Sequence, residues 1–567
     1  MTNQTYDICV VGSGAGAGPI IYELAKAGYK VCVLEKGPWL KTEDYSKDEY
    51  TACRQDLYTP NLADEFHEIE SYNKSKAEWR SKTTFKSGNT YWNGNVVGGS
   101  SNFMSAYFHR LKPVDFNLLT TYGPVEGANI VDWPINYEEL EPFYAKVESV
   151  VGVSGEVRQH STQEPRSTPN FPYPPLKTNL VSSWLDEAAR KEGYELVSVA
   201  RGILSQSKDS RGACYYSNYC GSYGCSSNAK SSSRVALIND AIATGNCTII
   251  PKAKVYHLET GKNRKIVKVH YYLGREKHFI SADIFVVAAQ AIETARLLLQ
   301  SKSEYYPNGV GNSTGQVGKN LVFSAGGIGG GFLEFDQLND TDKKAIKTPG
   351  LWVNRAIQHW YEIEDESFGG KVKGGTVDFV FEHANPMPKV NRQKKGKNGQ
   401  LVYGSELKKK IHHYFTAQRK IKFEIFNDWL PTDNCYVELS EDEVDKWGDP
   451  VAKVRIGYHP HDLKIARFLA DKGEDLLKRI GAKNVRTGIS SKPSPNLVAG
   501  GCRFGNDPEN AVLDKNCKTH DCDNLYIADA SFMPTGGSVP YTWTIYANSF
   551  RVADQIIREL KNKKSSK

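Results

Sequence analysis

The sequence lacks the long hydrophobic runs that membrane-spanning helices require. No stretch of about 18 apolar residues occurs in its 567 residues, so it predicts no membrane span. It also lacks room for a signal peptide, because the first predicted strand begins at Tyr6. We therefore expect the chain to carry no export address of its own.

A strong excess of one charge is missing as well. The chain has 72 Lys and Arg against 65 Asp and Glu, a net charge of +7. This balance is too mild and too evenly spread to indicate a nucleic-acid partner. Lysines gather in residues 389–410 and in residues 561–567, which are interpreted as a solvated loop and a frayed end.

The cysteines do not suggest a disulfide framework. Their number, 11, is odd, and Cys9 and Cys32 fall inside predicted buried strands, where a thiol serves as a small apolar side chain. The length is enough for two or three domains with a large core. The shares of hydrophobic residues (40 %) and charged residues (24 %) are typical of globular proteins.

The first 35 residues carry the clearest motif. Residues 6–11 and 31–34 are predicted buried strands, and a helix is predicted between them. The turn has the form G-x-G-x-x-A, with Gly12 for the tight bend, Gly14 for close approach to a pyrophosphate and Ala17 for helix packing. Glu35 ends the second strand, where it can accept hydrogen bonds from a ribose. This βαβ unit predicts a bound dinucleotide and leaves FAD and NAD open.

A second glycine-rich stretch narrows that choice. Residues 94–101 contain Gly98, Gly99 and Ser100, and Arg110 follows. This arrangement resembles the early signature of the glucose–methanol–choline (GMC) oxidoreductases, where such residues surround a flavin. The resemblance implies FAD rather than NAD.

The resemblance extends along nearly the whole chain. A predicted strand and helix over residues 284–299 resemble the second GMC signature, although Gln290 stands where the family usually has glycine. Residues 500–514 and the strand and helix from residue 524 onward resemble the closing block. The further FAD-contacting positions implied by the family are Val255, Ala289, Asp529, Ala530 and Thr542.

The implied fold class is α/β. We expect a Rossmann-like FAD-binding domain of the glutathione-reductase type and an antiparallel-sheet substrate domain. The FAD-binding domain is predicted over residues 1–321 and 491–567, with a surface insertion and cysteine loop near residues 150–233. The substrate domain is predicted over residues 322–490.

Three cysteines lie within twelve residues, in a loop rich in small and polar residues. They are Cys214, Cys220 and Cys225. Three thiolates cannot complete a four-thiolate zinc site. The spacing resembles the large subunits of bacterial FAD-dependent sugar and gluconate dehydrogenases, in some of which three cysteines hold a [3Fe–4S] cluster. The alternatives are three unligated thiols in a loop and a zinc site.

The usual catalytic pair of the family is absent. The resemblance places the first histidine at Leu497, preceded by Asn496, and the second histidine or asparagine at Pro540 or Tyr541. The base could come from His459 or His461, which are otherwise solvent-facing loop residues. Tyr541 could donate or accept a proton, and Asn496 could supply a polar group one residue away. The remaining alternative is a substrate that does not need alcohol-type proton abstraction.

These features predict an FAD-dependent dehydrogenase that oxidises a hydroxyl of a sugar, polyol or sugar acid. One alternative is an oxidase that returns electrons to O2, and another is a flavin-binding electron-transfer or assembly subunit without turnover of its own. Relatives with the cysteine loop imply a small accessory subunit and a cytochrome as partners, which leaves both cytoplasmic residence and co-export to the periplasm open. His109 does not lie at the family's usual attachment point, so the FAD is expected to be non-covalent.

Overall fold

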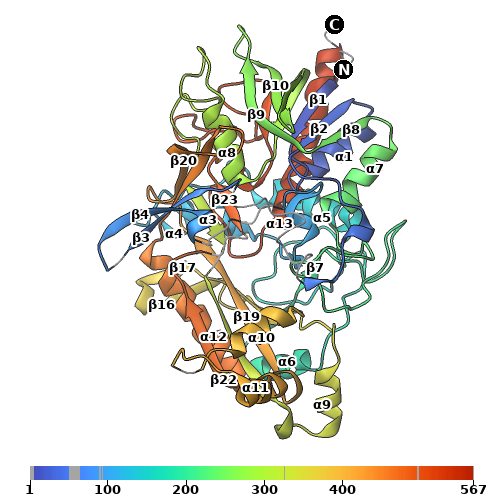
Figure 1. Ribbon diagram of the computed structural model, residues 1–567, viewed down its shortest axis with the longest axis vertical. Helices are drawn as coiled ribbons and strands as arrows, with labels where there is room; N and C mark the ends of the chain where they lie inside the picture. Colours follow the sequence, from blue (N-terminus) through green and yellow to red (C-terminus); the bar gives the residue numbers. More distant parts are fainter. Residues whose placement is uncertain are drawn as a thin grey trace.

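The chain forms two sheet-centred halves stacked along its longest axis (Figure 1). The computed structural model describes residues 6–49, 64–73, 75–87, 91, 94–324, 326–396, 398–493 and 497–565. A parallel sheet occupies the upper half in Figure 1, and a larger antiparallel sheet occupies the lower half. Both ends of the chain lie at the top of the upper half.

The upper sheet has five parallel strands in the order β24-β12-β1-β2-β8. Its members are β1 (Tyr6–Val11), β2 (Val31–Glu35), β8 (Cys247–Pro251), β12 (Ala282–Val287) and β24 (Leu525–Ile527). The helices α1 (Gly18–Lys26) and α13 (Thr542–Ser565) pack together beside it, and α8 (Ala291–Gln300) follows β12. The central strand β1 is almost fully buried, as parallel strands covered on both faces require. The βαβ unit predicted from the sequence is confirmed.

A small antiparallel sheet sits above the parallel one in Figure 1. It contains β9 (Ala253–Thr260), β10 (Ile266–Leu273) and β11 (Glu276–Ile280), in the order β11-β10-β9. This sheet connects β8 to β12, so β9 starts directly beside the carboxyl end of β8.

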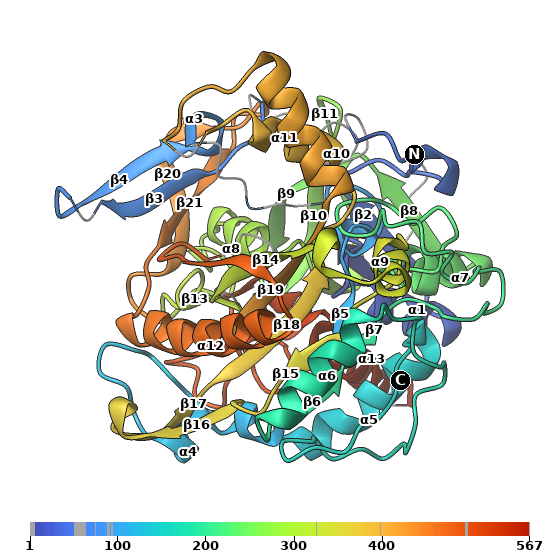
Figure 2. The same ribbon diagram turned by 90° about the horizontal axis from the view of Figure 1, so that it is seen from below.

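The lower sheet is antiparallel and has eight strands. Its main path runs β22 (Lys483–Ile489), β14 (Gly327–Glu334), β19 (Gln418–Trp429), β18 (Gly375–Phe381), β15 (Arg355–Ile357) and β6 (Leu196–Ser198), while β13 (Leu321–Ser324) pairs with both β19 and β23 (Val498–Gly500). The helix α12 (Pro460–Arg479) crosses this sheet, and α6 (Val181–Lys191) packs against α12 (Figure 2). The apolar side chains Ile421, Phe423 and Ile425 of β19 face this helical layer within one buried cluster.

The lower sheet confirms the expected α/β fold with an antiparallel substrate-side sheet, whereas the domain boundaries at residues 321 and 491 stay a prediction.

Another sheet has the order β20-β21-β3-β4 and projects from the side of the molecule in Figure 1. Its strands are β20 (Tyr436–Val444), β21 (Pro450–Ile456), β3 (Glu68–Asn73) and β4 (Glu78–Thr83).

The lysine-rich stretch at residues 389–410 is not a loop throughout. It lies within α10 (Pro386–Gln393), α11 (Gly404–Thr416) and the turn between them. The prediction of a loop is wrong because lysine is a good helix former and Leu407, Ile411 and Phe415 of α11 recur at helical spacing, although neither helix buries a residue.

Candidate functional site

The carboxyl edge of the parallel sheet opens into a cavity of about 380 Å³. Ligand pockets commonly measure about 300–1,000 Å³. Eleven residues predicted from the sequence line this cavity: Gly12, Gly14, Glu35, Gly99, Ser100, Val255, Ala289, Asp529, Ala530, Tyr541 and Thr542. They come from segments far apart in the chain, which the fold brings to one place. Two further predicted residues, Ala17 and Gly98, lie behind the wall of the cavity rather than on it.

The glycine turn after β1 forms one wall. A side-chain carbon added at Gly12 would lie 2.3 Å from the carbonyl oxygen of Ala288, so only glycine fits this turn. At Gly14 the same added carbon would meet nothing within 4 Å, because this position faces the cavity. At Gly16 it would lie 2.3 Å from the carbonyl oxygen of Ala528. Gly12 and Gly16 are therefore both tightly packed positions of this turn, while Ala17 is a fully buried residue at the start of α1.

Glu35 lies at the end of β2 and faces the cavity while nearly fully buried. Its carboxylate accepts hydrogen bonds from Ser13 Oγ at 2.5 Å and from the Gly37 amide at 2.8 Å. Burial raises the pKa of Glu35, and these two hydrogen bonds act against that rise. The carboxylate is thus held in place by its own turn.

The second glycine stretch packs directly on the first. The Gly98 amide donates to Ser13 Oγ at 3.0 Å, so Ser13 joins this stretch to Glu35. A carbon added at Gly99 would lie 2.9 Å from Gly14 Cα. Gly99 and Ser100 therefore continue the wall that Gly14 begins.

The link between β12 and α8 contains a strained residue. Gln290 follows Ala289 and has φ 82° and ψ 147°, a conformation that is favoured by glycine and rare for other residues. Its side-chain oxygen accepts hydrogen bonds from the Ile292 and Glu293 amides at 2.9 and 3.4 Å, and so caps α8. The glycine that the family resemblance leads one to expect here matches this backbone.

The segment after β24 supplies the facing wall. Asp529 accepts hydrogen bonds from Thr294 Oγ1 at 2.5 Å and from the Ser531 amide at 2.8 Å, and burial raises its pKa. Ala530 follows it, and Thr542 begins α13 on the same cavity. The free amide groups at this helix start favour negative charge nearby.

The catalytic positions of the family resemblance also line the cavity. Leu497, Pro540 and Tyr541 all face it, whereas Asn496 lies outside the described residues. Tyr541 is 2 % exposed, and its hydroxyl has no hydrogen-bond partner among the described residues. Burial raises the pKa of this phenol well above its ordinary value. Its hydroxyl therefore stays protonated and can donate a hydrogen bond, but it cannot act as a base.

The two alternative histidines do not reach the cavity. His459 caps α12, because its Nδ1 accepts from the His461 amide at 3.2 Å and its Nε2 lies 2.9 Å from the Glu126 carbonyl oxygen. His461 is the second residue of that helix, and burial lowers its pKa. Neither residue lines the cavity.

Sequence reasoning missed one acidic residue of the site, Glu424 of β19. Side chains alternate along a strand, so Glu424 and Phe426 point away from the core that holds Phe423 and Ile425. Both line the cavity. The Glu424 side chain is 32 % exposed, and its Oε1 lies 3.7 Å from Lys422 Nζ. The sequence shows that successive side chains of β19 point to opposite faces of the sheet. It does not show which of these faces meets the cavity.

The three loop cysteines line a different, smaller cavity of about 60 Å³ that shares Tyr107 with the large one. Burial raises the pKa of Cys214 to about 11. Burial also opposes ionisation of Cys225, but the nearby Lys230 ammonium holds its pKa below the ordinary value. Lys230 Nζ donates to the Cys220 and Tyr223 carbonyl oxygens at 2.9 and 2.8 Å.

These thiols do not form a ligand set in the structure. Within the described ranges, no three His, Cys, Asp or Glu side chains converge as they must to hold a metal ion. The predicted [3Fe–4S] site on Cys214, Cys220 and Cys225 is therefore not supported. None of the described helices is long and apolar enough to cross a bilayer.

Comparisons with known proteins place these features in a family context. Two family models, both described as GMC oxidoreductase, match residues 173–324 and 431–549. The 2-methyl-1,2-propanediol dehydrogenase of Mycolicibacterium austroafricanum is 29 % identical over 97 % of this chain and 95 % of its own. The fructose dehydrogenase large subunit of Gluconobacter japonicus is 26 % identical over 99 % of this chain and 100 % of its own. The paromamine 6'-oxidase of Streptomyces fradiae is 26 % identical over 98 % of this chain and 92 % of its own.

Solved structures agree on the fold. A formate oxidase of Aspergillus oryzae superposes with a TM-score of 0.63 at 15 % identity, covering 99 % of this chain and 100 % of its own. An FAD-dependent oxidoreductase of Chaetomium thermophilum superposes with a TM-score of 0.59 at 14 % identity, covering 98 % and 100 %. At these identities the likeness extends to the fold alone.

Proposed function

This chain belongs to the GMC oxidoreductases, and from that membership we propose that it is an FAD-dependent dehydrogenase that oxidises a hydroxyl of a sugar, polyol or sugar acid. The observation that carries the proposal is the single cavity shared by Gly14, Glu35 and the Asp529–Thr542 region. The βαβ motif predicts Gly14 and Glu35 at a dinucleotide, and the family resemblance assigns Asp529, Ala530 and Thr542 to FAD.

The residues of the cavity fit the cofactor. Open space in front of Gly14 leaves room for a pyrophosphate next to the start of α1, where helix amides favour negative charge. Glu35 is fixed where a ribose would be hydrogen-bonded, and Val255 lines the cavity at the position assigned to the adenine. We assign the flavin end to Asp529, Ala530 and Thr542. When bound, FAD supplies the acceptor for the hydride that leaves the carbon bearing the substrate hydroxyl.

The chain must also remove the proton of the substrate hydroxyl. We assign this role to Glu424, a carboxylate on the substrate-side strand β19 that faces the cavity. Tyr541 can hold the substrate oxygen by donating its unpartnered hydroxyl. Glu424 and Tyr541 would thus supply the proton acceptor and the hydrogen-bond donor that the apolar residues Leu497 and Pro540 cannot provide.

The names of similar proteins support the proposed substrate class. Three of them name 2-methyl-1,2-propanediol, fructose and paromamine as the compounds oxidised. A polyhydroxylated substrate is therefore the proposal for this chain. The term large subunit in one of those names supports a smaller accessory subunit as a partner. A cytochrome as electron acceptor is proposed from the family resemblance alone.

The direct test is an anaerobic titration of the purified flavoprotein with a panel of sugars, polyols and sugar acids. We expect at least one member to bleach the flavin absorbance, and we expect little peroxide when air is admitted. Rapid peroxide formation would instead identify an oxidase, which is the alternative that the paromamine 6'-oxidase relative favours. Bound flavin that no member of the panel reduces would favour a subunit without turnover of its own.

A second candidate concerns the path of the electrons. Cys214, Cys220 and Cys225 line one cavity, which shares Tyr107 with the FAD cavity, and this placement favours an electron exit there. Against a [3Fe–4S] relay, the three thiols do not converge. An iron assay with EPR on anaerobically purified protein decides the matter. About three irons per chain would establish the cluster, and flavin without iron would remove it.

A further inference from the structure

The hairpin formed by α10 and α11, residues 386–416, has an unusual surface. It contains eight lysines and arginines and a single acidic residue, Glu406. Neither helix buries a residue. This stretch, named the basic hairpin below, therefore concentrates positive charge that the nearly balanced chain does not show elsewhere to the same degree.

Large apolar side chains are exposed among these charges. Leu401 is 69 % exposed and Tyr403 is 75 % exposed, both at the turn of the basic hairpin. Met387 and Phe415, one on each helix, are 48 % and 44 % exposed. Single exposed apolar residues are common on soluble proteins, but four of this size within one projecting basic segment form a surface feature that needs a partner.

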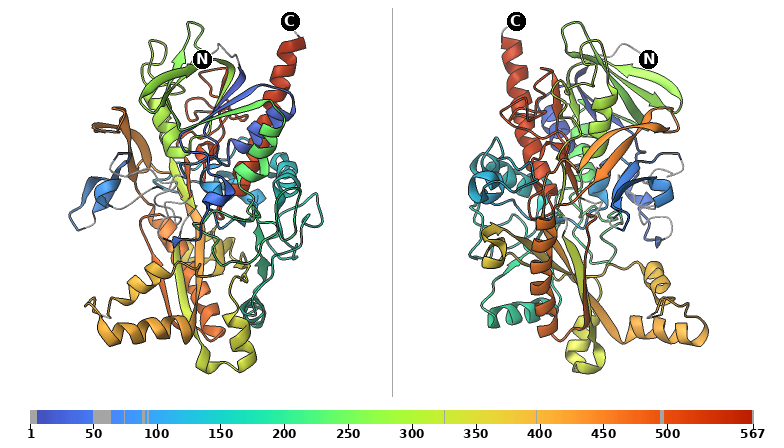
Figure 3. Two further views of the ribbon diagram at one scale, coloured as in Figure 1. Left: turned by 45° about the vertical axis from the view of Figure 1, so that its right-hand side comes forward. Right: turned by 90° about the vertical axis from the view of Figure 1, so that its left-hand side faces the viewer.

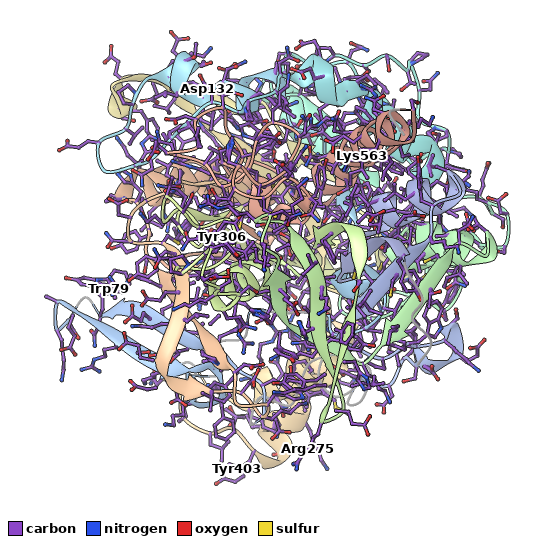
Figure 4. The ribbon with its side chains drawn as sticks, turned by 90° about the horizontal axis from the view of Figure 1, so that it is seen from above. Trp79, Asp132, Arg275, Tyr306, Tyr403 and Lys563 are labelled. Carbon is purple, nitrogen blue, oxygen red and sulfur yellow. The ribbon has the colours of Figure 1, made fainter. Side chains whose placement is uncertain are left out.

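The basic hairpin stands away from the body of the protein. It extends sideways from the lower half in both panels of Figure 3, and the β3–β4 ribbon extends from the same side. Figure 4 places Tyr403 at the outer limit of the molecule, and Trp79 of β4 at the outer limit of the ribbon. The ribbon and the residues after it carry exposed Tyr72 and Phe85. One side of the molecule thus presents two projections that carry exposed apolar side chains.

We propose that the basic hairpin docks the protein on an anionic lipid bilayer. Lysines and arginines near such a surface are attracted to its negative headgroups, and exposed apolar side chains insert at the boundary between headgroups and acyl chains. The combination of both kinds of side chain favours a bilayer over an acidic protein, since an acidic protein would pair the charges and leave Leu401 and Tyr403 in water. This docking is peripheral and does not depend on the proposed oxidation.

The test is co-sedimentation of the intact flavoprotein with vesicles. We expect binding to vesicles that contain phosphatidylglycerol, little binding to pure phosphatidylcholine vesicles, and a steep loss of binding as salt is added. The key variant combines Lys394→Gln, Lys395→Gln, Lys408→Gln and Lys409→Gln. Since each basic residue near the surface contributes about fivefold in affinity, the variant should bind at least about a hundredfold more weakly.

A matched control removes the same charge elsewhere. Lys30→Gln, Lys262→Gln, Lys302→Gln and Lys319→Gln change four exposed lysines dispersed over the rest of the surface, and this variant should keep nearly all of the binding. A third variant, Leu401→Ser with Tyr403→Ser, should weaken the binding that survives at high salt. Flavin absorbance verifies that each variant is folded.

The proposal is overturned if the wild-type protein ignores phosphatidylglycerol vesicles. It is also overturned if both lysine variants lose binding equally, because net charge alone would then explain the attraction. Binding to polyglutamate but not to vesicles would replace the bilayer with an acidic protein partner.

Discussion

Gly14 and Gly16 are separated by one residue, yet a methyl group at each would meet a different environment. At Gly14 the methyl group would point into the cavity, so Gly14→Ala should fold normally and bind FAD at least about tenfold more weakly. At Gly16 it would collide with the Ala528 carbonyl, so Gly16→Ala should lower the free energy of unfolding by about 1–3 kcal/mol. Flavin content and thermal unfolding of the apoprotein measure the two effects. Equal behaviour of the two variants would contradict the assignment of Gly14 to the cofactor.

Gln290 allows backbone strain to be separated from helix capping. Gln290→Ala keeps the unfavourable backbone conformation and removes the cap of α8, so it should destabilise the protein. Gln290→Gly also removes the cap but relieves the strain, so it should be more stable than the alanine variant by about 1–3 kcal/mol. Urea unfolding of the two variants gives the comparison. An alanine variant as stable as the glycine variant would show that the site is not strained.

Glu424 is the residue on which the proposed proton transfer depends. Glu424→Gln keeps the shape of the side chain and removes the base, so flavin reduction by substrate should slow by about 10²–10⁴-fold. FAD content should not change, because none of the residues assigned to FAD contacts depends on this carboxylate. The control is Glu364→Gln, on an exposed strand away from the cavity, which should leave the rate unchanged. A normal rate in Glu424→Gln would remove Glu424 as the base.

Some of these residues were accessible to sequence reasoning and others were not. Gly12, Gly14 and Glu35 were predicted because each belongs to a local pattern that the βαβ unit imposes on neighbouring residues. The close contact of Gly16 was not recognised, because its neighbour Ala528 lies more than five hundred positions further along the chain. Glu424 could not be assigned for the same reason, since the cavity face of β19 is defined by segments distant in sequence.

At the scale of elements, β19 connects the cavity to a buried ionic cluster. Asp428, near the end of this strand, accepts from Ser538 Oγ at 3.3 Å, in the segment that leads into α13. Burial raises the pKa of Asp428 to about 6, although the Lys373 ammonium acts in the opposite direction. The folded protein therefore holds this proton to a higher pH than the unfolded chain does.

This shift has a definite sign in unfolding experiments. Between about pH 4 and pH 6 the folded state binds more protons at Asp428 than the unfolded state, so its contribution to the free energy of unfolding falls as pH rises, by about 3 kcal/mol in all. Asp428→Asn removes this titration. Urea unfolding of both proteins at about pH 4 and about pH 7 should show the wild type losing stability relative to the variant. Parallel pH dependence of the two proteins would contradict the raised pKa.

Elements with strong local signals were predicted well, and elements defined by packing were not. The helix α12 has a continuous apolar stripe against the lower sheet, and such a stripe is visible in a sequence. By contrast, α10 and α11 were interpreted as a loop from their lysines, although Leu407, Ile411 and Phe415 of α11 recur at helical spacing. The pairing of β3 with β21 could not be foreseen, since it joins strands nearly four hundred residues apart.

For the whole molecule, the cofactor cavity is where the two halves of the chain depend on each other. Its lining combines the βαβ unit, the strand β19 and the first residues of α13, so a bound FAD would contact both sheets. Ligands that bind only the folded state stabilise it by mass action, by about 2.7 kcal/mol at a hundredfold excess over the dissociation constant. We expect removal of FAD to lower the melting temperature and re-addition to restore it. A melting temperature that FAD does not change would show that the cavity holds something else.

The central claim is that the cavity between Gly14 and Thr542 holds FAD. The most direct measurement is the absorption spectrum of the purified, folded protein, followed by release and quantification of the bound flavin. The account predicts flavin bands and an FAD content close to equimolar with the chain, released by denaturation because the flavin is not covalently attached. A folded, colourless protein that takes up no added FAD would contradict it.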